Sequence, residues 1–107
     1  MIKAIYHRKD NKLTIEGHAS SGEAGHDLVC AAASALVYTL AAFVTNMATN
    51  EQVKNPIVNL NEGNAEVSCK PSNKLKAAAT LVFDSICAGY DLLASQYPEN
   101  ITYEIRV

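Results

Sequence analysis

One long apolar stretch constrains the fold more than any other feature of the sequence. From Asp27 to Thr49 the chain reads DLVCAAASALVYTLAAFVTNMAT, which is rich in alanine and leucine and contains neither glycine nor proline. Because these residues favour helices and the stretch is too long for a strand, it predicts a helix. Apolar residues such as Leu36, Val37 and Phe43 lie on more than one face of that helix. One sheet cannot cover all of these faces, so we expect a homodimer in which a second subunit covers the rest.

Alternation of apolar and polar residues predicts strands in the rest of the chain. Two hairpins are expected, the first from Ile2–Tyr6 and Lys12–Glu16, and the second from Val58 and Leu60 with Ala65, Val67 and Cys69. The turn of the first hairpin is expected at Lys9–Asn11 and that of the second at Asn61–Asn64, since both segments have typical turn compositions.

A second helix and a last strand complete the pattern. Apolar residues recur at spacings of four and three from Leu75 to Leu93, with Ser72 as the expected helix cap and an end near Tyr97-Pro98. The alternating segment Ile101–Val107 predicts the final strand. The order ββαββαβ predicts an α+β fold, a two-layer sandwich of a mostly antiparallel five-stranded sheet and two helices.

Size and charge limit the classes of protein to consider. The 107 residues, of which 49% are hydrophobic and 19% charged, predict one globular domain over residues 1–107. A net charge of −2 lacks the basic patch that nucleic-acid binding needs. No secretory signal or uninterrupted apolar run of membrane-spanning length is expected. Together with an odd number of cysteines, these features predict a cytoplasmic protein with free thiols, without nucleic-acid or membrane partners.

The chemistry is expected around a small-residue loop, Ser20–Gly25, that separates two candidate residues. His18 ends the second strand and Cys30 lies near the start of the long helix. If Asp27 caps this helix, Cys30 is its third residue, where the positive end of the helix dipole favours the thiolate. A histidine at the strand end can then serve as the base in cysteine–histidine catalysis.

Other interpretations of these residues remain open. A cysteine in an apolar helix is usually an inert core residue, which is also how we interpret Cys69 and Cys87. A metal site from His18, His26, Asp27 and Cys30 matches none of the usual zinc spacings, and no metal or cofactor is expected. Ser34 shares a helix face with Cys30 and either hydrogen-bonds the thiolate or is an ordinary helix serine.

The segments Gly17-His18-Ala19 and Asp27-Leu28-Val29-Cys30-Ala31-Ala32, with Gly22, Gly25 and Ser34, closely resemble one known family. It is the ribosomal-processing cysteine protease family Prp, also described as YsxB-like proteins. Nearly the whole chain is covered, with the mild departure that Leu28 replaces the usual isoleucine. The resemblance implies a homodimeric endopeptidase that removes the N-terminal extension of the large-subunit ribosomal protein numbered twenty-seven.

The resemblance also implies roles for single residues. His18 falls on the catalytic histidine and Cys30 on the nucleophile, whereas Asp27 and Ser34 match accompanying polar positions. Gly22 and Gly25 match glycines of a mobile, substrate-binding loop. His26 falls on a variable position, which weakens it as a rival base. Whether Asp27 orients the histidine or only caps the helix is left open by the sequence.

Two other functions compete with proteolysis. The first is a non-enzymatic ribosome assembly factor or binding module in which Cys30 is buried and inert. The second is a thiol-dependent hydrolase acting on small molecules, which a domain of this size allows. Composition does not separate these functions, and the choice of a peptide substrate rests on the resemblance.

Overall fold

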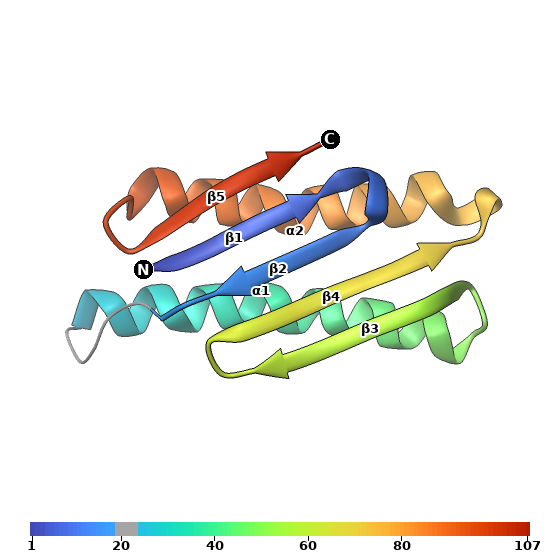
Figure 1. Ribbon diagram of the computed structural model, residues 1–107, viewed down its shortest axis with the longest axis horizontal. Helices are drawn as coiled ribbons and strands as arrows, with labels where there is room; N and C mark the ends of the chain where they lie inside the picture. The colour runs from blue at the N-terminus through green and yellow to red at the C-terminus, as the bar shows by residue number, and fades with distance from the viewer. Residues whose placement is uncertain (19–23) are drawn as a thin grey trace.

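A computed structural model describes residues 1–18 and 24–107, and for residues 24–27 it describes the backbone. The elements follow the predicted order ββαββαβ (Figure 1). They are β1 (Ile2–His7), β2 (Lys12–Glu16), α1 (Ala24–Thr49), β3 (Val53–Asn61), β4 (Asn64–Pro71), α2 (Lys76–Gln96) and β5 (Ile101–Arg106), with single 3-10 turns at Arg8–Asp10 and Asn73–Leu75.

The five strands form one sheet in the order β3-β4-β2-β1-β5. The pairs β1–β2, β2–β4 and β3–β4 are antiparallel, whereas β1 and β5 are parallel. The sheet is therefore mixed, which corrects the expectation of a mostly antiparallel sheet. Alternation shows which face a side chain occupies, but it does not show which strand lies beside β5 or in which direction.

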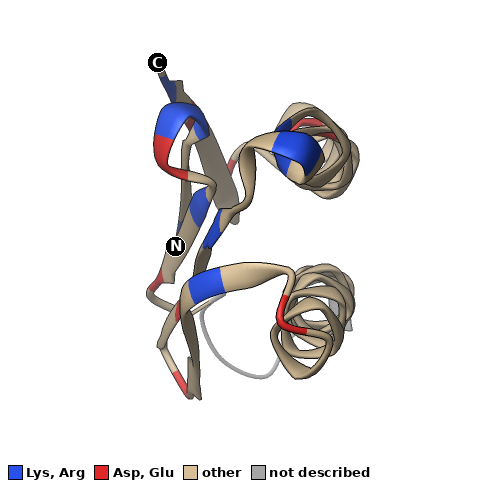
Figure 2. Cartoon of the chain, turned by 90° about the vertical axis from the view of Figure 1, so that its right-hand side faces the viewer, with Lys and Arg blue, Asp and Glu red and all other residues tan. Residues whose placement is uncertain are grey.

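Both helices cover the same face of the sheet, so the molecule has two layers (Figures 1 and 2). The core lies between the layers, where Leu13 and Val67 of the sheet are fully buried with Leu40 of α1 and Phe83 of α2. The predicted two-layer α+β sandwich is confirmed. The inward side chains of β1, at Ile2, Ala4 and Tyr6, are buried as the alternation predicts.

The start of α2 differs from the prediction. A 3-10 turn at Asn73–Leu75 precedes the helix, and the Ser72 side chain makes no capping hydrogen bond. The Ser72 carbonyl instead accepts a hydrogen bond from the Leu75 backbone N–H at 2.9 Å. The helix begins at Lys76 and ends at Gln96, next to the predicted end.

Two helical segments among the described residues, Leu28–Thr49 and Asn73–Gln96, are long and apolar enough to cross a membrane by length and composition. Both segments contain polar residues, such as Ser34 in the first and Asp84 in the second, so they do not contradict the expectation that no uninterrupted apolar run reaches this length. Core helices of globular domains meet the same criterion, and here Leu40 and Phe83 are fully buried against the sheet. Length and composition therefore do not place the chain in a membrane.

Candidate functional site

A cavity of about 440 Å³ lies between α1 and the turn that joins β3 to β4. The segment after β2 contributes Gly17 and His18, and α1 contributes Cys30 and Ser34. The wall opposite α1 is formed by residues 60–65 of the β3–β4 hairpin. In Figure 1 the end of β2, the first part of α1 and this turn lie at the same end of the sheet. The fold therefore gathers His18, Cys30 and Ser34, which are separated in sequence, along one cavity.

The α1 wall of the cavity is a row of residues at helical spacing. Cys30, Ser34 and Tyr38 follow one another at intervals of four, so they lie on one helix face. Cys30 is half-buried and packs against the hydrophobic core, whereas Tyr38 is 56% exposed. A half-buried thiol with one side on an open cavity is accessible to a substrate, unlike a core cysteine.

Backbone contacts of Gly17 and of His18 itself fix the position of His18. Gly17 precedes it with a φ of +89°, and a Cβ at Gly17 would lie 2.2 Å from the carbonyl oxygen of Met1. Only glycine fits there, because the contact is with backbone and the positive φ is unfavourable for other residues. The carbonyl oxygen of His18 accepts a hydrogen bond of 2.6 Å from the backbone nitrogen of Met1. The exposed His18 side chain thus extends from a fixed backbone.

The helix that carries Cys30 begins earlier than the sequence predicts. Because α1 starts at Ala24, Asp27 is the fourth residue of the helix and not its cap. Cys30 is the seventh residue, not the third, so it lies about 9 Å along the axis from the first residue. The helix dipole acts mainly within the first turn, so its effect on Cys30 is weaker than expected.

Some predicted site residues cannot be placed in the cavity. Gly22 lies outside the described residues. Gly25, His26 and Asp27 lie in the first turns of α1, but their side chains are outside the described part of the structure. The roles proposed for Asp27 and for the two loop glycines therefore remain predictions. Within the described residues, no three histidine, cysteine or acidic side chains lie close enough together to hold a metal ion.

Sequence reasoning missed the β3–β4 turn as part of this site. Leu60, Glu62 and Gly63 all line the cavity. The available signal was the glycine in the predicted turn Asn61–Asn64, which was interpreted as turn chemistry. Strand order decides that this turn lies beside His18, because β4 pairs with β2 and brings the two chain segments together.

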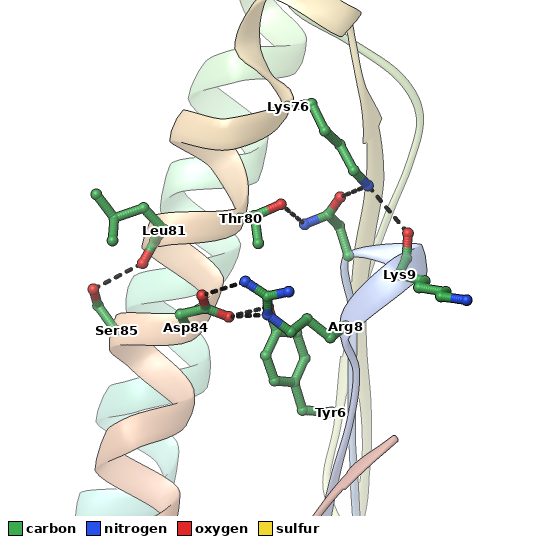
Figure 3. A network of polar contacts seen from close by, with 9 residues as sticks. Tyr6, Arg8, Lys9, Lys76, Thr80, Leu81, Asp84 and Ser85 are labelled. Carbon is green, nitrogen blue, oxygen red and sulfur yellow. Dashed lines mark hydrogen bonds and ion pairs between the residues drawn. The ribbon is translucent and has the colours of Figure 1, made fainter. Parts of the chain in front are cut away.

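A second cavity, of about 480 Å³, lies beside α2 and contains Cys87. Its lining includes a polar network in which Asp84 accepts hydrogen bonds from Tyr6 and Arg8 (Figure 3). Cys87 is 1% exposed, and burial raises its pKa to about 12. Burial likewise raises the pKa of Cys69 above its usual value. The expectation that these two cysteines are buried is confirmed.

Comparison with protein families gives a match over almost the whole chain. The family model described as "Cysteine protease Prp" matches residues 1–102. Two Staphylococcus aureus proteins, each named ribosomal processing cysteine protease Prp, are 27% identical to this chain over 93 residues. The matched region covers 87% of this chain and 84% of each relative.

Solved structures with the same fold include the S. aureus protease Prp in complex with a substrate peptide, with a TM-score of 0.68 and 21% identity. That match covers 98% of this chain and 97% of the other. A Streptococcus mutans protein matches with a TM-score of 0.66 and 26% identity, covering 97% of this chain and 90% of that protein. From the family match over residues 1–102, the chain belongs to the Prp family and is a cysteine protease.

Proposed function

We propose that Cys30 is the nucleophile of this protease and His18 its general base. The observation that carries this proposal is the cavity itself, which is lined by the half-buried thiol of α1 and by the histidine after β2. Cysteine–histidine catalysis needs both side chains at one cavity, whatever their separation in sequence. Cys69 and Cys87 are 2% and 1% exposed, so neither is accessible to a peptide.

The proposed reaction begins when the His18 imidazole takes the proton from the Cys30 thiol. The thiolate adds to the carbonyl carbon of the scissile peptide bond, and the carbon–nitrogen bond then breaks. The leaving amine takes the proton from the imidazolium, which leaves a thioester on Cys30. Water, deprotonated by His18, hydrolyses the thioester and releases the carboxylic acid and the thiol.

Further residues are proposed to support these steps. Ser34 lines the cavity one helical turn after Cys30, where its hydroxyl can hydrogen-bond the thiolate. Asp27 is proposed as a supporting group, and Gly22 and Gly25 as part of a loop over the substrate. Backbone N–H groups beside Cys30 lie inside α1 and bond carbonyls four residues back, so an oxyanion hole has to be formed elsewhere.

The proposed substrate is the N-terminal extension of the large-subunit ribosomal protein numbered twenty-seven. Support comes from the S. aureus relatives, which are named ribosomal processing proteases, and from the S. aureus structure that holds a substrate peptide. An extended N-terminal peptide suits an open cavity between a helix and a hairpin, whereas a folded protein does not fit a volume of about 440 Å³.

The test is to incubate the purified protein with this ribosomal precursor under reducing conditions and to measure the product mass. We expect cleavage by the wild type and no cleavage by Cys30→Ser or His18→Ala. Cys69→Ala is the matched control, because it removes a buried thiol away from the cavity and should leave cleavage intact.

Other outcomes would favour the alternatives. An uncut precursor with folded wild-type protein would favour the assembly factor with an inert Cys30. Equal cleavage by Cys30→Ser would mean a different nucleophile or a contaminating protease. Turnover of a small thioester or ester without peptide cleavage would favour the small-molecule hydrolase.

A homodimer is proposed from the outer face of α1. From Leu28 to Thr49 the chain contains no Asp, Glu, Lys or Arg, and Leu28 and Tyr38 are 59% and 56% exposed. An uncharged helix face of this kind is typical of a subunit contact. Sedimentation at micromolar concentration should give twice the mass of the chain, and a monomer would contradict the proposal.

A cytoplasmic location is also proposed, because the chain has an odd number of cysteines, three, and because Cys69 and Cys87 are buried thiols, as is usual in a reducing compartment. Cell fractionation tests this proposal. Recovery of the protein with the membrane after a high-salt wash would contradict it and would implicate the two apolar helices.

A further inference from the structure

The His18 ring lies against the β3–β4 turn at the position of Gly63. A Cβ placed on Gly63 would be 2.6 Å from Nε2 of His18 and 2.9 Å from its Cε1. Real Cβ atoms do not approach other atoms this closely, so one edge of the imidazole occupies the space that any other side chain would fill. The missing side chain of Gly63 is therefore what makes room for the ring.

The backbone of the same turn holds the segment that carries His18. The carbonyl oxygen of Gly63 accepts a hydrogen bond of 3.0 Å from the backbone N–H of Gly17. The turn thus fixes Gly17, the residue before His18, through a backbone hydrogen bond. It also leaves space for the imidazole, because Gly63 has no side chain. These two contacts are independent, because the first does not depend on which residue stands at position 63.

Turn geometry is a second reason for a glycine at position 63, separate from the contact with the His18 ring. Gly63 has a φ of +74°, a value that favours glycine in a turn whatever lies nearby. Asparagine is more tolerant of positive φ than other non-glycine residues. Hence Gly63→Asn keeps the backbone conformation more readily than Gly63→Ala, but both variants add the Cβ that meets the ring.

We propose that Gly63 is a positioning residue, which seats the His18 imidazole at the cavity opposite α1. The catalytic consequence rests on the proposed role of His18 as the base for Cys30. The ring is the end of a flexible side chain, so an added Cβ moves the ring and leaves the turn in place. Other titratable groups that line the cavity are Cys30, Tyr38 and Glu62, and none of them changes in these variants.

The experiment compares Gly63→Ala and Gly63→Asn with the control Asn55→Ala. Asn55 lies in β3 with a φ of +49°, so alanine there also strains the backbone of this hairpin. It already has a Cβ and does not line the cavity, so the control adds strain without an atom beside His18. The ring resonances of His18 are read by NMR and distinguished from those of the other two histidines with His18→Ala.

Both Gly63 variants should shift the His18 ring resonances, and Asn55→Ala should leave them unchanged. The pH profile of Cys30 alkylation should move towards that of His18→Ala. Peptide cleavage should fall by about tenfold to a hundredfold, because a misplacement of about 1 Å has effects of this size. A loss of stability without a displaced ring would leave the NMR signals and the pH profile of the folded protein unaltered.

Unchanged ring resonances in Gly63→Asn would overturn the proposal, as would an equal shift in Asn55→Ala. Failure of the proposed function gives a different pattern. In that case wild type and His18→Ala share one alkylation profile and the precursor stays uncut. The NMR comparison still reports whether Gly63 seats the ring, since it requires no turnover.

Discussion

Two cavities of similar volume, one beside α1 and one beside α2, each contain a cysteine, but the surroundings of the two thiols differ. Cys30 is half-buried in a cavity of about 440 Å³ that also contains His18 and the β3–β4 turn. Cys87 is 1% exposed in a cavity of about 480 Å³ that is lined by Tyr6, Arg8 and Asp84.

The two thiols differ in burial and in their polar neighbours, since Cys87 is hydrogen-bonded with Tyr103. In the α2 cavity the cation, Arg8, is bound to Asp84 at 3.0 Å, and burial raises the pKa of Cys87 to about 12. In the α1 cavity the exposed His18 imidazole lies against Gly63, which has no side chain. A cysteine in a cavity is therefore not reactive in itself, and its burial and its neighbours decide the chemistry.

The largest expected effect is the difference in alkylation between Cys30 and the two buried cysteines. Because burial raises the pKa of Cys87 to about 12, this thiol stays protonated at pH 8. Brief treatment of the folded protein with iodoacetamide should therefore label Cys30 and leave Cys69 and Cys87 unlabelled, as mass spectrometry of the peptides will show.

Protein unfolded in urea is the control, since all three thiols should then react. Labelling of Cys87 before Cys30 in the folded protein would contradict the distinction between the cavities. It would also remove the basis for assigning Cys30 as the nucleophile.

The polar contacts near the α2 cavity extend to Asn11, where we expect the largest effect on stability. Asn11 is fully buried with a φ of +45°; its Nδ2 donates to the Thr80 hydroxyl at 3.1 Å, and its Oδ1 accepts from Lys76. Asn11→Ala should lower the free energy of unfolding by about 3 kcal/mol, since it removes both bonds and puts alanine in the left-handed region. Urea unfolding measures this loss.

Asn11→Gly is the matched variant, because it removes the same side chain and tolerates the positive φ. It should be about 1 kcal/mol more stable than Asn11→Ala. Alkylation of Cys30 should keep its wild-type rate in both variants while they are folded. A slower rate would mean that the two cavities are coupled through the sheet.

Much of the fold follows from local patterns, and what does not follow depends on distant contacts. Alternation predicted the strands and the buried faces of β1 and β4, and alanine content predicted α1. The apolar side chains of residues 58–60 in β3, and Ile105 of β5, are exposed, although they alternate in the same way. The parallel pairing of β5 with β1 was not predictable, because it joins the two ends of the chain. Asn11 was assigned to a turn correctly, but its burial depends on Lys76 and Thr80 of α2, which no local pattern reveals.

The site was predictable to a similar extent. His18, Cys30 and Ser34 were named from the sequence and line one cavity. The sequence favours a helix that begins at Asp27, which is a good capping residue, yet the helix continues back to Ala24. The contact of Gly63 with His18 was not predictable, because it arises from strand order and from the absence of a side chain.

The smallest expected effect concerns the ion pair of Arg8 and Asp84, which lines the α2 cavity. Hydrogen bonding from Arg8 is the largest contribution that holds the pKa of Asp84 below its usual value. A lowered pKa in the folded state means that the carboxylate stabilises the fold above the unfolded-state pKa, near 4, and that this contribution is lost as the pH falls through the folded-state value. Both side chains are partly exposed, at 45% for Arg8 and 35% for Asp84, so the contribution is small and screened by salt.

Asp84→Asn should therefore be less stable than wild type at pH 7, and the difference should shrink at pH 3, where the wild type has begun to lose the same contribution. Tyr6→Phe is the matched variant, because it removes one donor to Asp84 at 2.8 Å and keeps the ion pair with Arg8. Its stability difference from wild type should also shrink at low pH, but by less than that of Asp84→Asn, because the carboxylate and its ion pair with Arg8 remain. Urea titrations at pH 7, 5 and 3 measure all three proteins, and a stability difference that stays constant over this range would show that the Asp84 charge does not stabilise the fold.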